Sequence, residues 1–139
     1  MMKPVRVGPM TDDGYCFVCG QKNPIGLKLD FDFNGKTIKT EFVSRKEHQG
    51  YLNIVHGGII MTLLDEAMVK LAIAMDIPAV TARMDIRLRK ALDVGKKITV
   101  EAEITDETRR TLDAYAKAVT ADNEIIADAK GKLIKAQPG

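Results

Sequence analysis

Apolar and polar residues alternate in the first third of the chain. In residues 27–33 (LKLDFDF) every second residue is apolar, which is the period of a strand with one buried face. The dipeptide Asn34-Gly35 follows and is typical of tight hairpin turns. Residues 38–43 (IKTEFV) then form a second strand-like segment. The pattern therefore predicts an antiparallel hairpin.

The period changes between residues 57 and 75, where apolar residues recur at helical spacing. They are Ile60, Leu63, Leu64, Ala67, Met68, Leu71, Ala72 and Met75. Thr62, Glu66 and Lys70 form one narrow polar stripe on this helix. A helix with so little polar surface is mostly buried, with one thin face left for solvent or a partner. Its predicted length is about 28 Å, enough to cross a small domain.

Alternation returns after the helix in four segments, each of which predicts a strand with one apolar face. These faces comprise Val80, Ala82, Met84, Ile86 and Leu88; Ile98, Val100, Ala102 and Ile104; Leu112, Ala114, Ala116 and Ala118; and Ala127, Ala129, Gly131 and Leu133. A turn at Asp122-Asn123 separates the last two. Their small residues leave room for a bulky neighbour, and the helix is the obvious one. The predicted class is α+β, an antiparallel sheet wrapped around a central helix.

Length and composition fit one folded domain. The 139 residues are 45% hydrophobic and 29% charged, which is ordinary for a globular protein and too apolar for a disordered one. Residues 1–15 are polar and interrupted by proline and glycine, so we expect an N-terminal arm there and a single domain over 16–139. There are 21 Lys and Arg and 19 Asp and Glu, giving a net charge of +2. Nucleic-acid-binding proteins usually carry a clear basic excess, so we expect no nucleic acid as a partner of this chain.

The sequence shows no targeting or membrane segment. The first residues lack the apolar run of a signal peptide. The most apolar stretch, residues 59–75, contains Asp65, Glu66 and Lys70, and three charges there argue against a membrane span. We therefore expect a cytoplasmic protein that does not associate with a membrane.

His56-Gly57-Gly58 stands where the strand pattern stops and the helix begins. The first turn of a helix leaves backbone N–H groups without partners, and the helix dipole adds partial positive charge there. Two glycines allow another molecule to approach these N–H groups closely. One interpretation is an oxyanion hole for a carbonyl group. The other is that the glycines only permit a tight turn into the helix, with His56 as its cap.

Asp65 lies in the middle of the predicted helix, off the polar stripe and beside apolar residues. Burying a carboxylate costs roughly several kcal/mol unless the group is paired with a positive charge or takes part in a reaction. It is therefore either a general base or nucleophile, or the partner of an arginine such as Arg83 or Arg87 on the next strand. Those arginines could alternatively bind ligand phosphates, or belong to a solvated sheet face balanced by nearby acids.

Cys16 and Cys19 form a C-x-x-C pair in the segment CFVCG. A structural zinc site needs four ligands, and His48 and His56 do not complete an obvious one. A redox motif would need a thioredoxin-like βαβ setting, which the pattern does not predict. We therefore expect free thiols in a packed turn, no metal and no cofactor.

The run GYLNIVHGGIIMTLLDEAM resembles the active-site helix of hotdog-fold acyl-CoA thioesterases, in particular their phenylacetate-degradation-type branch. In that branch His-Gly-Gly opens the long helix and an acidic residue follows nine positions after the histidine, as His56 and Asp65 do here. The segment CFVCGQKNPIGL is similar to the one that precedes the first strand in many members. The resemblance covers roughly residues 16–135 and implies the hotdog fold.

The resemblance also implies roles for individual residues. Asp65 matches the catalytic carboxylate, and Gly57 matches the residue whose backbone N–H polarises the thioester carbonyl. His56 matches the histidine that orients that loop and can touch the carbonyl. Thr81 matches a hydroxyl that helps to hold the attacking water in some relatives. Gly58 would lie against the same substrate group.

Many relatives carry Asn or Gln six residues before the histidine, and its side-chain amide contacts the thioester. This chain departs from that pattern. That position is Gly50 here, and Gln49 and Asn53 are the nearby amides that could replace it. Arg83 and Arg87 are the candidates for the phosphates of the substrate.

The resemblance further implies a homodimer formed by edge-to-edge strand pairing, and pairs of dimers as a tetramer. Spacing supports the dimer separately, because Gly57 and Asp65 would be about 12 Å apart along one helix. An oxyanion donor and a base must both lie within about 3 Å of one reacting centre. Two antiparallel helices from two subunits related by a two-fold axis meet this requirement.

The function predicted from the sequence is hydrolysis of an acyl- or aryl-CoA thioester to the free acid and CoA. The alternative is a non-catalytic acyl-CoA-binding hotdog protein, a sensor or carrier that would not need an ionised Asp65. A hotdog dehydratase is a third interpretation, but that subgroup places its histidine and acid differently. The sequence does not specify the acyl group.

Overall fold

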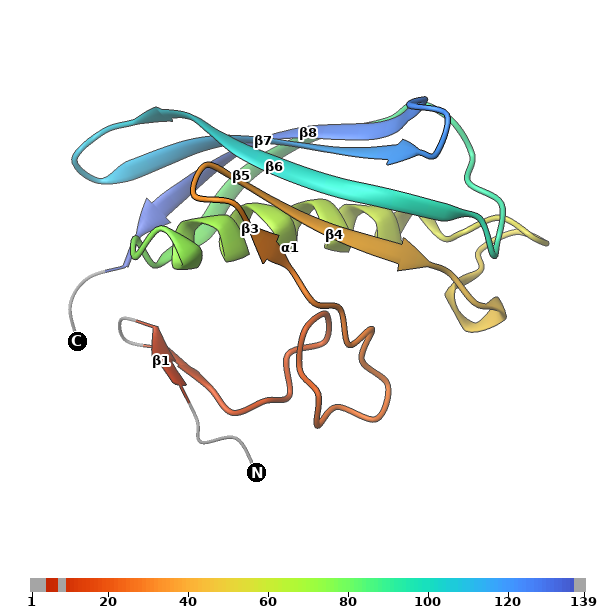
Figure 1. Cartoon of the computed structure of the whole chain (residues 1–139), viewed down its shortest axis with the longest axis horizontal. Coiled ribbons are helices and arrows are strands. Elements are labelled where there is room, and N and C mark those ends of the chain that lie inside the picture. Colours follow the sequence, from red (N-terminus) through yellow and green to blue (C-terminus); the bar gives the residue numbers. More distant parts are fainter. Residues whose placement is uncertain (1–4, 8–9, 137–139) are drawn as a thin grey trace.

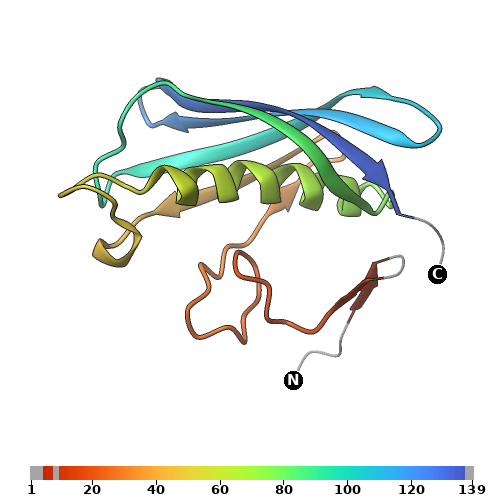
Figure 2. The same cartoon turned by 180° about the vertical axis from the view of Figure 1, so that it is seen from behind.

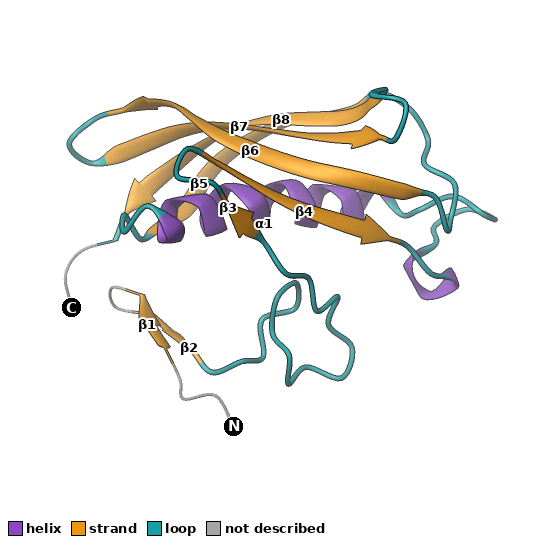
Figure 3. Cartoon of the chain, in the orientation of Figure 1, coloured by secondary structure: helices purple, strands orange, loops and turns teal. Residues whose placement is uncertain are grey.

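The computed structural model describes residues 5–7 and 10–136 (Figures 1 and 3). The chain forms β1 (Val5–Val7), β2 (Met10–Asp12), β3 (Asp32–Phe33), β4 (Thr37–Val43), a 3-10 turn η1 (Lys46–His48), α1 (Gly57–Ala74), β5 (Ala79–Leu88), β6 (Lys97–Glu107), β7 (Thr111–Thr120) and β8 (Ile125–Lys135). The predicted helix and its four following strands are confirmed, each within a few residues of the expected bounds.

One antiparallel sheet curves around the helix. Its six strands run in the order β3-β4-β6-β7-β8-β5, and every neighbouring pair is antiparallel. Helix α1 crosses the concave face of this sheet, as Figures 1 and 2 show from opposite sides. The segment before β3 passes on the other side of α1. The α+β class and the hotdog arrangement of the sheet and helix are therefore confirmed.

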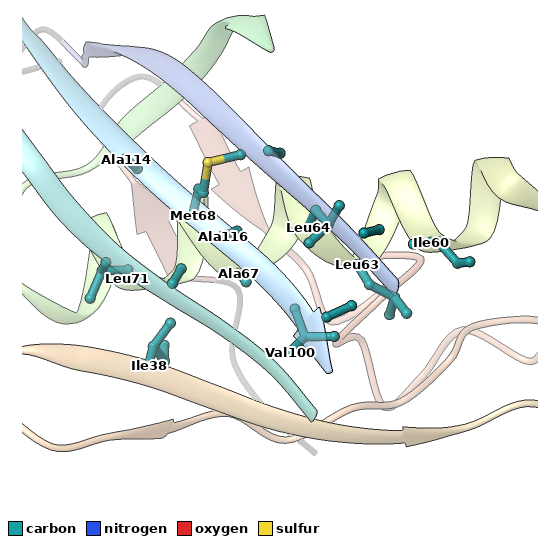
Figure 4. Packing of buried hydrophobic residues seen from close by; sticks show 14 of the residues in the cluster. Ile38, Ile60, Leu63, Leu64, Ala67, Met68, Leu71, Val100, Ala114 and Ala116 are labelled. Carbon is teal, nitrogen blue, oxygen red and sulfur yellow. The ribbon is translucent and has the colours of Figure 1, made fainter. Parts of the chain in front are cut away.

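The small residues of β7 and β8 admit the helix closely (Figure 4). Ala114, Ala116 and Ala129 are buried against α1. A Cβ added at Gly131 would lie only 2.7 Å from the sulfur of Met68, far inside van der Waals contact. The expectation that these strands make room for the helix is thus confirmed.

The first predicted strand is much shorter than its alternating pattern suggested. Only Asp32 and Phe33 pair with β4, and residues 27–31 run without regular strand pairing. Lys28 has a φ of 55°, which takes the backbone out of the extended conformation. The predicted turn at Asn34-Gly35 is present, with Gly35 at a φ of 95°, and the returning strand is confirmed.

A β-bulge in β5 corrects the predicted faces of this strand. The pairing with β8 shifts between Thr81 and Arg83, so that Ala82 is the additional residue. Thr81 therefore faces α1, although alternation had placed it with the arginines on the outer face. Met84 and Ile86 face inward as predicted, whereas Val80 and Ala82 are exposed. A bulge adds one residue to one strand and so reverses the alternation on either side of it.

β1 and β2 form a separate two-stranded antiparallel sheet in the region predicted as an arm. The division into an arm of residues 1–15 and a domain of residues 16–139 stays a prediction, and residues 1–4, 8–9 and 137–139 lie outside the described residues. Within the described part of the chain, no helix has the length and apolar character needed to cross a membrane.

Candidate active site

The start of α1 is fixed by its own histidine. His56 is the N-cap, and its Nδ1 accepts a hydrogen bond of 2.9 Å from the N–H of Gly58. Its carbonyl accepts a hydrogen bond of 3.0 Å from Ile59. His56 therefore does act as a cap, which was one of the two interpretations of the sequence. The N–H of Gly58 is consequently occupied, and Gly57 is the donor left at the first turn.

A small network holds the loop that leads into α1. The His56 N–H donates to the carbonyl of His48 at 2.8 Å, and the Val55 N–H donates to that of Leu92 at 2.9 Å. The buried His48 also accepts a bond of 2.9 Å from the Arg45 N–H. Burial, together with the nearby charge of Arg45, lowers the pKa of His48 below its usual value. His48 is therefore a neutral structural support for the start of the helix.

Gln49, one of the two amides expected near the substrate, has its side chain bonded within its own loop. The side-chain oxygen of Gln49 accepts a hydrogen bond of 3.0 Å from the backbone N–H of Asn53, and Asn53 has a φ of 62°. Gly50 lies against the histidine, where an added Cβ would be 3.3 Å from the Cα of His56. The cavity beside the helix start is lined by Gly50, and neither amide is among its described lining residues.

This cavity at the start of α1 has a volume of about 590 Å³ and is lined by Gly50, His56, Gly57, Leu88 and Arg89, among others. As the first helical residue, Gly57 has no preceding turn to accept its N–H. Within residues 10–136 the Gly57 N–H donates to no acceptor. A Cβ added to Gly57 would lie 2.9 Å from a methyl group of Leu88. The absence of a side chain thus keeps an unpaired donor open to the cavity.

Asp65 lies in the middle of α1, half-buried, and its partner comes from β5. The Thr81 hydroxyl donates a hydrogen bond of 2.5 Å to Oδ1 of Asp65. The bulge after Thr81 makes this possible, because it turns the hydroxyl toward the helix. Neither Arg83 nor Arg87 is paired with Asp65 in the described part of the chain. Arg83 lies 3.6 Å from Asp85 on the outer face.

A second cavity, of about 560 Å³, contains Asp65 and Thr81. Its other wall is the N-terminal segment, including Tyr15, Cys16 and Cys19. The structure therefore brings Asp65 together with Thr81, and His56 together with both glycines, but it does not bring these two groups together. Each group opens on a cavity of its own.

The polar stripe of α1 faces the N-terminal segment, which sequence reasoning missed. The thiol of Cys16 donates to Oε2 of Glu66 at 3.1 Å, and Cys19 shares hydrogen bonds with Lys70 and Cys16. Both cysteines are free thiols, as predicted. Burial raises the pKa of Cys19 to about 12, against the hydrogen bond of Lys70, which lowers it. The only sequence signal was the coincidence of a C-x-x-C pair with a charged stripe on a buried helix.

The outer face of the sheet carries the arginines predicted to bind substrate. Arg83 and Arg87 lie there, outside the two cavities just described. On this face Asp128 accepts hydrogen bonds from Arg89 at 2.9 Å and from Tyr115 at 3.0 Å. Burial opposes ionisation of Asp128, but these hydrogen bonds outweigh it and lower its pKa.

Comparison with known proteins gives a family match and a relative by sequence. The model of the thioesterase superfamily matches residues 52–127, more than half of the chain. A putative esterase of Archaeoglobus fulgidus is 31% identical over 97 residues, which cover 70% of this chain and 63% of the relative. The chain thus matches less than two thirds of the length of that curated relative.

Solved structures share the fold at lower identity. A hypothetical thioesterase from Streptococcus pneumoniae, determined with coenzyme A, has a TM-score of 0.74 and 17% identity, covering 80% of this chain and 91% of that one. Two further structures are of single variants of the S. pneumoniae thioesterase. One replaces an aspartate by alanine, and the other replaces a threonine sixteen positions later by alanine. The E. coli PaaI protein from the phenylacetic acid degradation operon has a TM-score of 0.76 and 17% identity, covering 81% and 82%.

Proposed function

Because the chain belongs to the thioesterase superfamily, we propose that it hydrolyses an acyl- or aryl-CoA thioester to the free acid and coenzyme A. The observation that carries this proposal is the hydrogen bond between Thr81 and Asp65. The two residues are sixteen positions apart, the separation of the aspartate and threonine replaced in the S. pneumoniae thioesterase. The coenzyme A bound to that protein and the esterase name of the archaeal relative support the same reaction.

The helix start supplies the electrophilic half of the reaction. The N–H of Gly57 donates to the thioester carbonyl oxygen, and the positive end of the helix dipole favours the charge that develops there. His56 holds this turn in place through its bond to Gly58. The donor belongs to the backbone, so no metal is required to polarise the carbonyl.

Asp65 supplies the other half. As a general base it takes a proton from water while the water oxygen bonds to the carbonyl carbon. The carbon–sulfur bond then breaks, and the proton passes to the departing thiolate. As a nucleophile, Asp65 would instead attack the carbonyl carbon and expel the coenzyme A thiolate, which takes up a proton from solvent. Water then hydrolyses the resulting anhydride, which releases the free acid and restores Asp65. In either case the Thr81 hydroxyl fixes the carboxylate through Oδ1 and leaves its second oxygen for the reaction.

Two subunits are needed to join the halves. Gly57 and Asp65 are separated by about 12 Å of helix, and they line different cavities. The ten-residue strand β5 is an edge of the sheet, and an unpaired edge of that length is a template for another strand. Val80 and Leu88 on β5 are 40% and 46% exposed. We therefore propose a homodimer formed through β5, with Gly57 of one chain facing Asp65 of the other, and a further pairing of dimers.

Substrate recognition in this proposal uses groups around the start of α1 and along β5. Arg83 and Arg87 lie on β5 and stay candidates for the coenzyme A phosphates, since arginine binds phosphate oxygens in a bidentate manner. Gly58, Gln49 and Asn53 stay candidates for the region around the thioester. Because the side chain of Gln49 is bonded within its loop, its contribution would come through the shape of the loop.

The direct test is a thiol-release assay with a panel of short, long and aromatic acyl-CoAs. Turnover of at least one of them, with release of free coenzyme A, is the expected result. Tight binding of acyl-CoAs without any thiol release would overturn the proposal and favour the non-catalytic sensor or carrier.

Mixed dimers test the shared site. The variants Asp65→Asn and Gly57→Val are unfolded and refolded together in equal amounts, so that about half of the dimers contain one chain of each kind. Each such dimer has one intact site, so activity should recover to roughly a quarter of the wild-type value. If both groups act within one chain, mixing restores nothing. Mass-tagged subunits confirm that exchange has taken place.

A further inference from the structure

The C-x-x-C segment folds into a tight turn that gathers its two thiols. The N–H of Gly20 donates to the carbonyl of Cys16 at 2.9 Å. A Cβ added at Gly20 would lie 2.4 Å from the backbone nitrogen of Cys16, so only glycine fits here. Phe17 and Val18, between the cysteines, accept backbone bonds from Leu27 and Leu29 at 2.8 and 2.9 Å. The turn is therefore preformed and supported on both sides.

Helix α1 adds a third group of the same chemical kind. Glu66 approaches the turn from 50 residues further along the chain, and its Oε2 is 3.1 Å from the Cys16 sulfur. The two sulfurs and a carboxylate oxygen of Glu66 all lie within 4.8 Å of one another, and each residue is only partly exposed. The sequence prediction of no metal rested on finding two ligands, and it did not include Glu66.

We infer that Cys16, Cys19 and Glu66 form a binding site for one thiophilic divalent ion of the zinc class. The site has three protein ligands and a fourth position open to the groove, that is, the second cavity, which contains Asp65 and Thr81. Zinc binds thiolate sulfur at about 2.3 Å, which puts two sulfurs of a tetrahedral site roughly 3.7 Å apart. The three ligand atoms lie within 4.8 Å of one another, which is close to that spacing. Its mixture of two soft sulfurs with a harder oxygen suits zinc better than cuprous ion.

The surrounding charge also suits such an ion. Two thiolates and a carboxylate carry three negative charges against the two positive charges of the ion. Lys70 is hydrogen-bonded to Cys19 and supplies the remaining positive charge. A donor to a ligand sulfur is a typical outer neighbour of a metal site, where it orients the ligand and adjusts its basicity.

The ion would fasten the N-terminal segment to the helix. This segment passes along the side of α1 that the sheet does not cover (Figure 2). It forms one wall of the groove that contains Asp65 and Thr81. Binding would therefore stabilise the fold and fix this wall, while the three ligands are distinct from the residues assigned to hydrolysis.

Cobalt provides a readout that is independent of activity. The full chain is kept reduced with a phosphine, freed of metal with a chelator, and titrated with Co²⁺. We expect one ion per chain, with thiolate-to-cobalt absorption in the near ultraviolet and the intense visible bands of a four-coordinate ion. Added Zn²⁺ should remove this absorption and raise the melting temperature.

Variants assign the ligands. Cys16→Ser and Cys19→Ser are each expected to weaken binding by more than about a hundredfold, beyond the loss that follows when an outer neighbour is changed. Glu66→Gln should weaken binding by at least about tenfold. Glu103→Gln is the matched control, because Glu103 is exposed on β6, and it should bind as the wild type does.

Melting in chelator shows whether each variant is folded before its ion binding is measured. A cysteine variant that fails to fold leaves the decision to the other cysteine variant and to Glu66→Gln. The inference is overturned if the reduced wild type binds no Co²⁺ with sulfur absorption. It is equally overturned if binding persists in the folded variants, since the ion would then lie elsewhere.

Discussion

The two halves of the proposed active site, the start of α1 and the groove around Asp65, are positioned in different ways. The start of α1 is made by neighbours in sequence, because His56 caps Gly58 from two residues away. The groove around Asp65 depends on residues far apart, since Thr81 is sixteen positions away and Cys16 is 50 positions from Glu66. A helix terminus thus provides its donors from the backbone, whereas a half-buried carboxylate needs tertiary structure to position it.

Electrostatics separates the two regions as well. Gly57 stands at the positive end of the α1 dipole, whose effect fades within about one turn. Asp65 lies more than two turns further along and receives no comparable support. Its orientation depends on one hydroxyl. We therefore expect activity to survive replacement of the His56 side chain if the backbone turn at Gly57 keeps its shape. Around Asp65, by contrast, loss of the single Thr81 hydroxyl should already lower the activity.

The largest effect is expected when the charge of Asp65 is removed. Asp65→Asn keeps the shape of the side chain but cannot accept a proton or attack the carbonyl, so kcat should fall by about 10²–10⁴-fold. Thiol release under saturating substrate measures this. Asp106→Asn, at an exposed position of β6, is the control and should keep the wild-type rate. An Asp65→Asn protein with near-normal turnover would remove the groove from the mechanism.

A side chain at Gly57 should have the next largest effect. Gly57→Val covers the free N–H and meets Leu88, whose methyl would be 2.9 Å from the new Cβ. Losing an oxyanion donor costs about 10²–10³-fold in kcat. Combining it with Leu88→Ala gives the new side chain room. We expect the double variant to regain thermal stability without regaining turnover, and recovery of both would place the donor elsewhere.

Thr81 tests the support of Asp65 with a smaller change. Thr81→Val preserves shape but removes the hydrogen bond to Oδ1, and bonds to charged groups are worth about 1.5–3 kcal/mol. We expect kcat to fall roughly tenfold to a hundredfold by the corresponding conversion of that energy. Thr81→Ser retains a hydroxyl and should restore most of the rate. If Val and Ser behave alike in steady-state assays, the hydroxyl does not position Asp65.

The same contrast explains which features the sequence could predict. Periodicity located α1 and the four strands after it, because burial of one face repeats along each element. It also indicated the helix start, since His56-Gly57-Gly58 is contiguous. The small residues of β8 correctly predicted the close approach of the helix, which Met68 and Gly131 now show in detail.

Features that depend on distant contacts were beyond the pattern. Nothing local in β5 announces the bulge after Thr81, so the alternation put this hydroxyl on the wrong face. The run at residues 27–33 alternates perfectly, yet the φ of Lys28 and the lack of a partner strand leave most of it outside the sheet. Glu66 could not be joined to the cysteines because the path of the N-terminal segment was unknown.

The smallest expected effect decides what His56 contributes. His56→Ala removes the cap on Gly58 and should lower the free energy of unfolding by about 0.5–2 kcal/mol, measured by urea denaturation. His56→Asn separates capping from imidazole chemistry, because asparagine is among the best N-caps and should keep nearly the wild-type stability. If His56 only shapes the turn, the Asn variant keeps its turnover while the Ala variant loses some through a looser helix start. If the imidazole itself contacts the thioester carbonyl, both variants lose activity to a similar extent, and stability and rate no longer change together.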